Sequence, residues 1–170
     1  MGTELLVDAF ERVRDAVHPA VNGLTTDELT WRPDGESNSI AWLVWHLTRI
    51  QDDHIAGIDG DPQVWTAAGW VDRFALPLDP SDTGYGHDPE AVATVTADAA
   101  SLLGYFEDVH ARTLAFLAGL GEADLARVVD DRWDPPVTMA VRLVSVIADD
   151  LQHVGQAAYL RGLVQRLTGD

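Results

Sequence analysis

Apolar residues recur at intervals of three and four along four long segments of this sequence, and this spacing sets the fold class. In the first segment the repeat runs through Leu6, Phe10, Val13 and Val17. Residues at these intervals share one face of an α-helix, whereas a half-buried strand alternates apolar and polar residues, a pattern that no segment follows convincingly. We predict helices at about residues 4–21, 40–58, 89–117 and 138–167. The sequence therefore predicts an all-α four-helix bundle, folded as one domain over residues 1–170.

A connection of nearly thirty residues, from Asp59 to His87, separates the second predicted helix from the third. It is rich in Gly, Pro and Asp, but it also holds Trp65, Trp70 and Phe74. Loops of this length in compact domains are usually functional or disordered, and disordered segments are poor in aromatic residues. We therefore predict an ordered flap whose aromatic side chains close a site on the bundle.

The charge and composition of the chain exclude several classes of function. A net charge of −17 makes nucleic acid and anionic lipid unlikely partners, because binding to both depends on basic side chains. No apolar run is long enough to span a bilayer and no signal peptide is evident, so we expect a soluble, cytoplasmic protein. All 11 basic residues are arginine, which is a hint of a GC-rich, actinobacterial source. Because the chain has no cysteine, any thiol chemistry must use a thiol that the substrate brings.

Two side chains in the last predicted helix have the spacing of a chelating pair. Asp149 and His153 are four residues apart, so both project from one face about one turn apart. Their row is otherwise apolar, and an unpaired carboxylate buried there would be costly. A metal ion would satisfy both groups, and His46 on the second helix could supply a third ligand. An isolated Asp and His at this spacing also form ordinary ion pairs, so the spacing alone leaves both interpretations open. Asp150 points about 100° away and is expected to be a surface or supporting group.

Further side chains are candidates for contacting a substrate. Arg49 on the second helix and Arg142 on the last could hold anionic groups, although solvated surface charge is the alternative for each. His54, two turns beyond His46, is expected at the core or its rim rather than as a fourth ligand. His110 is expected at the surface.

Two motifs in this order resemble the DinB superfamily, and the resemblance covers essentially the whole chain. They are Trp42-Leu43-Val44-Trp45-His46-Leu47, and Asp149-Asp150-Leu151-Gln152-His153-Val154-Gly155-Gln156 followed by Tyr159-Leu160-Arg161-Gly162. The resemblance implies a metal-binding helical bundle whose three usual histidine ligands fall on His46, position 149 and His153. Aspartate at position 149 departs from the commoner histidine. Two imidazoles and one carboxylate are compatible with Zn or Ni, and also with Mn or Fe(II).

The superfamily includes the metal-binding domain of mycothiol-dependent maleylpyruvate isomerase and the bacillithiol and mycothiol transferases. The resemblance therefore implies a metal-dependent S-transferase or isomerase that joins a low-molecular-weight thiol, mycothiol in an actinobacterium, to a small electrophile. It also implies a homodimer formed through helix faces. Two alternatives stay open: a non-catalytic, metal-stabilised protein that binds a small molecule, and a metal-dependent hydrolase, for which Asp53 and His54 are the candidate bases.

Overall fold

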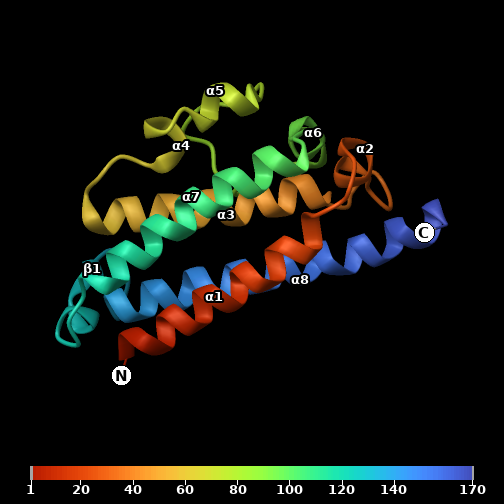
Figure 1. Cartoon of the computed structure of the whole chain (residues 1–170). Helices are drawn as coiled ribbons and strands as arrows, with labels where there is room; N and C mark the ends of the chain where they lie inside the picture. The colour runs from red at the N-terminus through yellow and green to blue at the C-terminus, as the bar shows by residue number, and fades with distance from the viewer. Residues whose placement is uncertain (1, 170) are drawn as a thin grey trace.

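The computed structural model describes residues 2–169, and within them four long helices form a bundle (Figure 1). These helices are α1 (Gly2–Val21), α3 (Ile40–Asp59), α7 (Ala99–Ala118) and α8 (Met139–Thr168). Each long helix packs mainly against two others: α8 lies between α1 and α3, and α7 lies between α3 and α1 on the other side. The predicted all-α four-helix bundle is confirmed.

The long connection changes the direction in which the helices run. In Figure 1, α1 and α8 run one way, whereas α3 and α7 both run the other way. The flap therefore returns the chain to the starting end of α3 before α7 begins. Because α3 and α8 run antiparallel along their shared face, the first half of α3 meets the middle of α8.

Side-chain caps fix where the helices begin. Thr25 and Glu28 form a capping box at α2 (Thr26–Thr30), and the Ser39 side chain accepts from the backbone N–H of Trp42 at the start of α3. Asp88 caps α6 (Pro89–Thr94), as its position before a proline predicts. The prediction of one helix over residues 89–117 was wrong. The backbone is extended at Val95, and Asp98 then caps a new helix, α7.

Five short elements complete the described part of the fold. The flap contains α4 (Val64–Ala67) and α5 (Trp70–Phe74), and the connection from α7 to α8 contains a 3₁₀-helix, η1 (Asp124–Ala126). It also contains two antiparallel strands, β1 (Val128–Asp130) and β2 (Val137–Thr138), which are too short for an alternating pattern to reveal in the sequence. No helix among the described residues has the length and apolar character needed to cross a membrane.

The flap is ordered and is anchored on the bundle by a buried carboxylate. Asp52 of α3 is fully buried and accepts hydrogen bonds from the backbone N–H groups of Val64 and Trp65, at 2.9 and 2.8 Å. The Tyr105 hydroxyl of α7 also donates to the Asp52 carboxylate, at 2.9 Å. One side chain therefore ties the flap to two helices of the bundle.

Three polar side chains for which a surface position was expected or left open lie in the interior. His110 is 3% exposed, so its expected surface position was wrong. Arg49 and Asp150 are each 0% exposed, which contradicts the surface interpretation that was one of two open for each. Burial and the neighbouring charge of Asp149 raise the pKa of Asp150 well above its ordinary value, which favours the neutral form of this carboxyl. Burial also lowers the pKa of His110. Neutral forms are the ones that an apolar core tolerates.

Candidate metal centre

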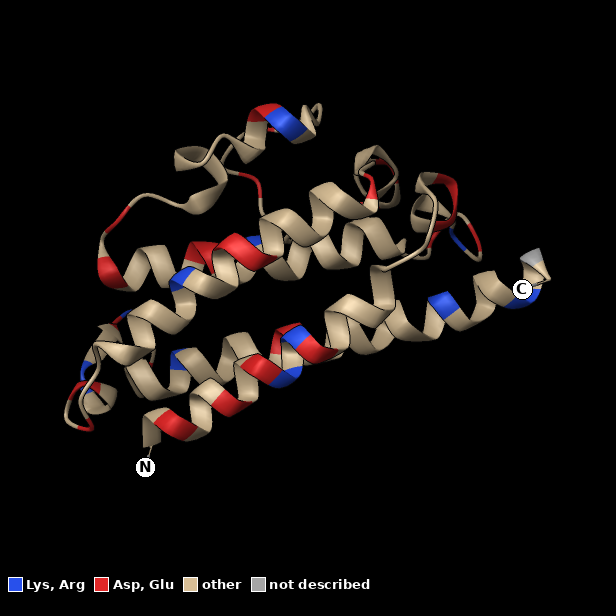
Figure 2. Cartoon of the chain, in the orientation of Figure 1, with Lys and Arg blue, Asp and Glu red and all other residues tan. Residues whose placement is uncertain are grey.

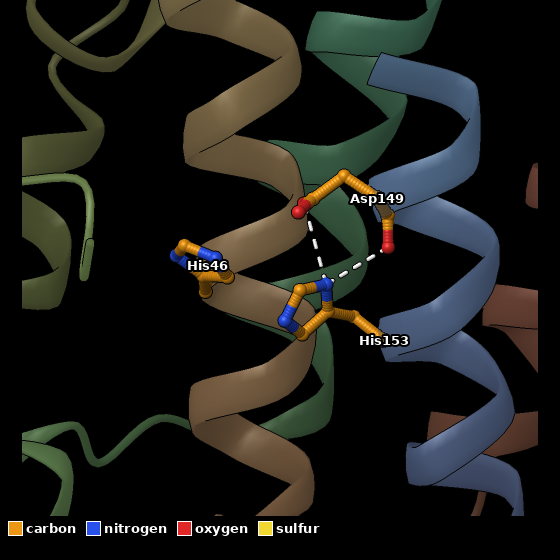
Figure 3. A group of neighbouring side chains, drawn as sticks. All are labelled: His46, Asp149 and His153. Carbon is orange, nitrogen blue, oxygen red and sulfur yellow. Dashed lines mark hydrogen bonds and ion pairs between the residues drawn. The ribbon is translucent and has the colours of Figure 1, made fainter. Parts of the chain in front are cut away.

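His46, Asp149 and His153 meet where α3 faces the middle of α8. Each offers one ligand atom, and these three atoms all lie within 4.8 Å of one another. Figure 3 shows the two α8 side chains one turn apart, both pointing toward His46 on the opposite helix. His46 is buried, whereas the other two are partly exposed. The structure therefore brings together the three residues that the sequence pointed to.

The His46 ring is held with one nitrogen free. Its Nδ1 lies 2.6 Å from the backbone carbonyl oxygen of Thr83, and a carbonyl can only accept, so Nδ1 carries the proton. The Trp42 ring stacks on the imidazole with 4.6 Å between ring centroids. Burial lowers the pKa of His46, which favours the neutral ring. A neutral imidazole protonated at Nδ1 has its lone pair on Nε2, the form that binds metals.

Asp149 and His153 form a pair on α8. His153 Nδ1 lies 2.8 Å from the Asp149 backbone carbonyl and 3.3 Å from its carboxylate Oδ2. Burial alone would lower the pKa of His153, but the contacts with Asp149 are stronger in sum, and the pKa is raised. Burial alone would raise the pKa of Asp149, but the contacts with His153 and the neighbouring histidines are stronger in sum, and the pKa is lowered. Among the described residues, the buried Asp149 Oδ2 has no hydrogen bond of ordinary geometry. This oxygen is left able to accept from a further group.

The donor set fits a divalent metal ion. Two imidazoles and one carboxylate supply three lone pairs, and the carboxylate oxygen without a hydrogen bond is the kind of atom that a cation satisfies. Two ligands on one zinc ion lie at most about 4.2 Å apart, since each bond is about 2.1 Å long, so the observed spacing is close to that needed. The group could therefore hold a metal ion, with coordination positions left for water or substrate.

His54 and Arg142 line a separate polar cleft of about 450 Å³ at the end of the bundle. Arg142 donates to His54 Nδ1 at 3.0 Å and to Asp130 at 2.9 Å. Burial, followed by the charge of Arg142, lowers the pKa of His54. The charge of Asp149 acts against this lowering of the His54 pKa, but none of the three triad residues lines the cleft. His54 therefore lies at the rim of the core, as the sequence predicted.

Arg49 and the three flap aromatics lie in a different environment from the triad. Trp65, Trp70 and Phe74 are buried around Tyr105 of α7, with ring centroids 5.0 to 6.0 Å from the Tyr105 ring. The Arg49 guanidinium donates to Gln63 at 2.7 Å and lies over the Trp65 ring. These side chains pack the flap onto α3 and α7, and this packing accounts for their burial without a role in contacting a substrate.

A different part of the flap reaches the triad. Thr83 accepts from His46, and Gly84 lies against the same ring. His87 accepts from the Trp42 indole N–H at 3.1 Å. Residues 82–87 lie at the end of the predicted flap, and neither Thr83 nor Gly84 was predicted to contact the site. The two glycines at 84 and 86, on either side of a tyrosine, were the available signal, since this spacing favours tight turns.

These features define a class of protein: a four-helix bundle that presents two imidazoles and a carboxylate from facing helices as a potential metal site. The sequence matches the DinB superfamily over residues 9–157, and the chain belongs to that superfamily. A conserved protein from Enterococcus faecalis, known from a crystal structure, has the same fold with a TM-score of 0.89. It is 34% identical, and the alignment covers 95% of this chain and 96% of that one. No curated protein matches the sequence.

Proposed function

We propose that this protein binds one divalent metal ion through His46, Asp149 and His153 and uses it to activate a low-molecular-weight thiol. The convergence of the three ligand atoms within 4.8 Å carries the proposal, and the buried Asp149 Oδ2, which has no hydrogen bond of ordinary geometry, supports it. When bound, a divalent cation lowers the pKa of a coordinated thiol, so that sulfur can attack an electrophile at neutral pH. Zn or Ni suits this donor set best, with Mn or Fe as further candidates.

The residues of the chain itself have three roles in such a reaction. His46 presents Nε2 because Thr83 holds the proton on Nδ1. Asp149 supplies a negative charge, which keeps the site able to take a cation. The absence of cysteine means that no thiol of the chain competes with the co-substrate. The expected product is a thioether or, after the thiol leaves again, an isomer of the electrophile. We place this activity in the cytoplasm, where small thiols are kept reduced.

The hydrogen bonding of His54 argues against the hydrolase alternative. Arginine only donates, so the lone pair on His54 Nδ1 is engaged by Arg142 and the neutral ring carries its proton on Nε2. Asp53, the other candidate base, accepts from the Gln63 amide at 2.7 Å. His54 therefore lacks the free lone pair that a general base requires, and one oxygen of Asp53 is already engaged.

A direct assay separates the proposed transferase from both alternatives. Metal-loaded protein is mixed with a test electrophile such as 1-chloro-2,4-dinitrobenzene and, in separate reactions, with glutathione, bacillithiol or mycothiol. Metal-dependent formation of the thioether supports the proposal, and the arginine-only composition makes mycothiol the first choice. Metal-dependent cleavage of an ester without thiol would support a hydrolase instead, and binding without turnover a binding protein.

We further propose that two copies of the chain associate through α8. An exposed apolar stripe runs along this helix at alternating intervals of three and four: Val141, Val144, Ala148, Leu151, Gly155 and Ala158. This is the spacing of a helix that packs lengthwise on another. In Figure 2 acidic residues follow one another along α1, where they are Glu4, Asp8, Glu11 and Asp15, whereas the longer α8 carries only Asp149 and Asp150. Pairing through α8 therefore keeps two strongly acidic molecules from facing each other with their most negative surfaces.

We expect light scattering to give a dimer at micromolar concentration and Leu151→Glu to give a monomer, because the substitution places a charge in the middle of an apolar interface. Leu5→Glu is the matched control: this leucine is also exposed, at 69%, but lies on α1. A wild-type monomer at these concentrations would overturn the proposal.

A further inference from the structure

Residues 82–87 form a strap that lies across one edge of His46. The Thr83 carbonyl accepts the His46 Nδ1 proton, and Tyr85 at the outer side of the strap is 89% exposed. A single layer of backbone therefore separates this part of the candidate metal site from solvent. Gly84 and Gly86 have φ angles of +87° and +76°, which side-chain-bearing residues rarely adopt.

Gly84 is the point at which the strap touches the ligand. A Cβ atom built on Gly84 would lie 2.8 Å from His46 Nδ1, 3.0 Å from the Trp45 ring and 3.3 Å from the Trp42 ring. Such distances are too short for carbon, so any side chain here must push the strap or the imidazole away. A Cβ on Gly86, by contrast, meets nothing within 4 Å. The two glycines share a backbone conformation but differ in contact with His46.

The strap is fastened on both sides of this contact. At one end, the fully buried Arg49 donates from Nε to the Asp82 carbonyl at 3.0 Å. At the other end, His87 Nδ1 accepts from the Trp42 indole N–H, which can only donate, so His87 Nε2 carries a proton. That nitrogen lies 3.0 Å from both oxygens of the Asp82 carboxylate. The Asp82 side chain also accepts from the Gly84 N–H at 2.8 Å. Each end is thus held by a side chain that α3 supplies.

We propose that this strap is a positioning device for His46: it selects the imidazole tautomer with Nε2 unprotonated and holds that nitrogen toward Asp149 and His153. Gly84 permits the close approach, and His87 with Asp82 locks it. The inference rests on the proposed metal site and adds residues to it that contact neither metal nor substrate. Partners that orient a metal-binding histidine in this way typically contribute about 10- to 100-fold to metal affinity.

The test compares Gly84→Ala with Gly86→Ala. Both substitutions place alanine at a positive φ angle, so both cost stability for the same backbone reason. Only Gly84→Ala displaces the strap from His46. We expect Gly84→Ala to weaken Zn(II) binding about 10- to 100-fold, measured by competition with a chromophoric chelator, and Gly86→Ala to retain wild-type affinity.

A second pair of variants tests the fastening, and it also serves if Gly84→Ala does not fold. His87→Phe removes both hydrogen bonds of the ring and should lower Zn(II) affinity. His87→Gln can still accept from Trp42 and donate to Asp82, so it should restore most of that affinity.

A metal-free measurement separates this inference from the proposed function. Long-range ¹H–¹⁵N correlation spectra of the metal-free protein should report His46 as the Nδ1-protonated tautomer in wild type and in Gly86→Ala, and a mixture of tautomers in Gly84→Ala. If wild type binds no metal but the tautomers behave as expected, the proposed function fails and the positioning role stands. Unchanged tautomer and unchanged metal affinity in both Gly84→Ala and His87→Phe would overturn the positioning role.

Discussion

Replacing His46 and His153 together with alanine is expected to abolish binding of a divalent metal ion while leaving the helix content unchanged. The two imidazoles supply two of the three ligand atoms that lie within 4.8 Å of one another, and Asp149 alone cannot retain an ion against water. Each single substitution should weaken binding by more than about 100-fold, since removal of a mere supporting partner already costs 10- to 100-fold. Metal analysis of the purified protein and titration with Zn(II) measure the effect, and circular dichroism monitors the fold.

Two neighbouring variants calibrate this result. Gln152 is an exposed residue beside His153, and its side-chain amide donates to the Ala148 carbonyl of the same helix. The Gln152→Ala variant should therefore keep full metal occupancy. Asp149→His restores the superfamily's commoner ligand, so it should retain metal and shift the preference among ions. Full occupancy in the double variant would rule out this site and, with it, the proposed chemistry.

Asp52→Ala is expected to lower the free energy of unfolding by about 3–5 kcal/mol, the usual cost of removing one partner from a buried ion pair. The Asp52 carboxylate is 0% exposed, and it lies 3.7 Å from the guanidinium groups of both Arg49 and Arg112. Without Asp52, the fully buried Arg49 loses its nearest negative charge. The flap also loses two backbone hydrogen bonds at Val64 and Trp65. Urea denaturation followed by tryptophan fluorescence measures both the stability and the release of the flap.

Two control variants distinguish the effect of the Asp52 charge from that of a single hydrogen bond to it. Tyr105→Phe removes one hydrogen bond to Asp52 and should cost about 1–3 kcal/mol, because it leaves a buried acceptor with one donor fewer. Asp61→Ala changes an exposed acid of the same flap and should stay within about 0.5 kcal/mol of wild type. A loss of less than about 1 kcal/mol for Asp52→Ala would mean that the aromatic cluster holds the flap without this carboxylate.

Local properties of the chain determined the fold class and most of the candidate site. Helical periodicity and capping residues such as Thr25, Ser39 and Asp88 depend on neighbours a few residues away, and each of these three side chains caps a helix in the structure. The pairing of Asp149 with His153 is local in the same sense, since one helical turn separates them. The prediction of His46 as the third ligand depended on the family motif, because the local sequence does not indicate which helix faces α8.

Tertiary packing alone decided which polar side chains are buried and which part of the flap reaches the site. Every residue from Ser39 to Arg49 is buried, because α3 is covered by α7, α8, α2 and the flap at once. A helix covered on all sides has no solvated face, so periodicity could not reveal that Arg49 points into the interior. Asp150 likewise occupies a core position of α8, where burial raises the pKa of its carboxyl. The strap over His46 depends on a contact across 37 residues, between Thr83 and a ring on another element. The hydrogen bonds that hold the strap join groups distant in sequence, and only folding brings these groups together.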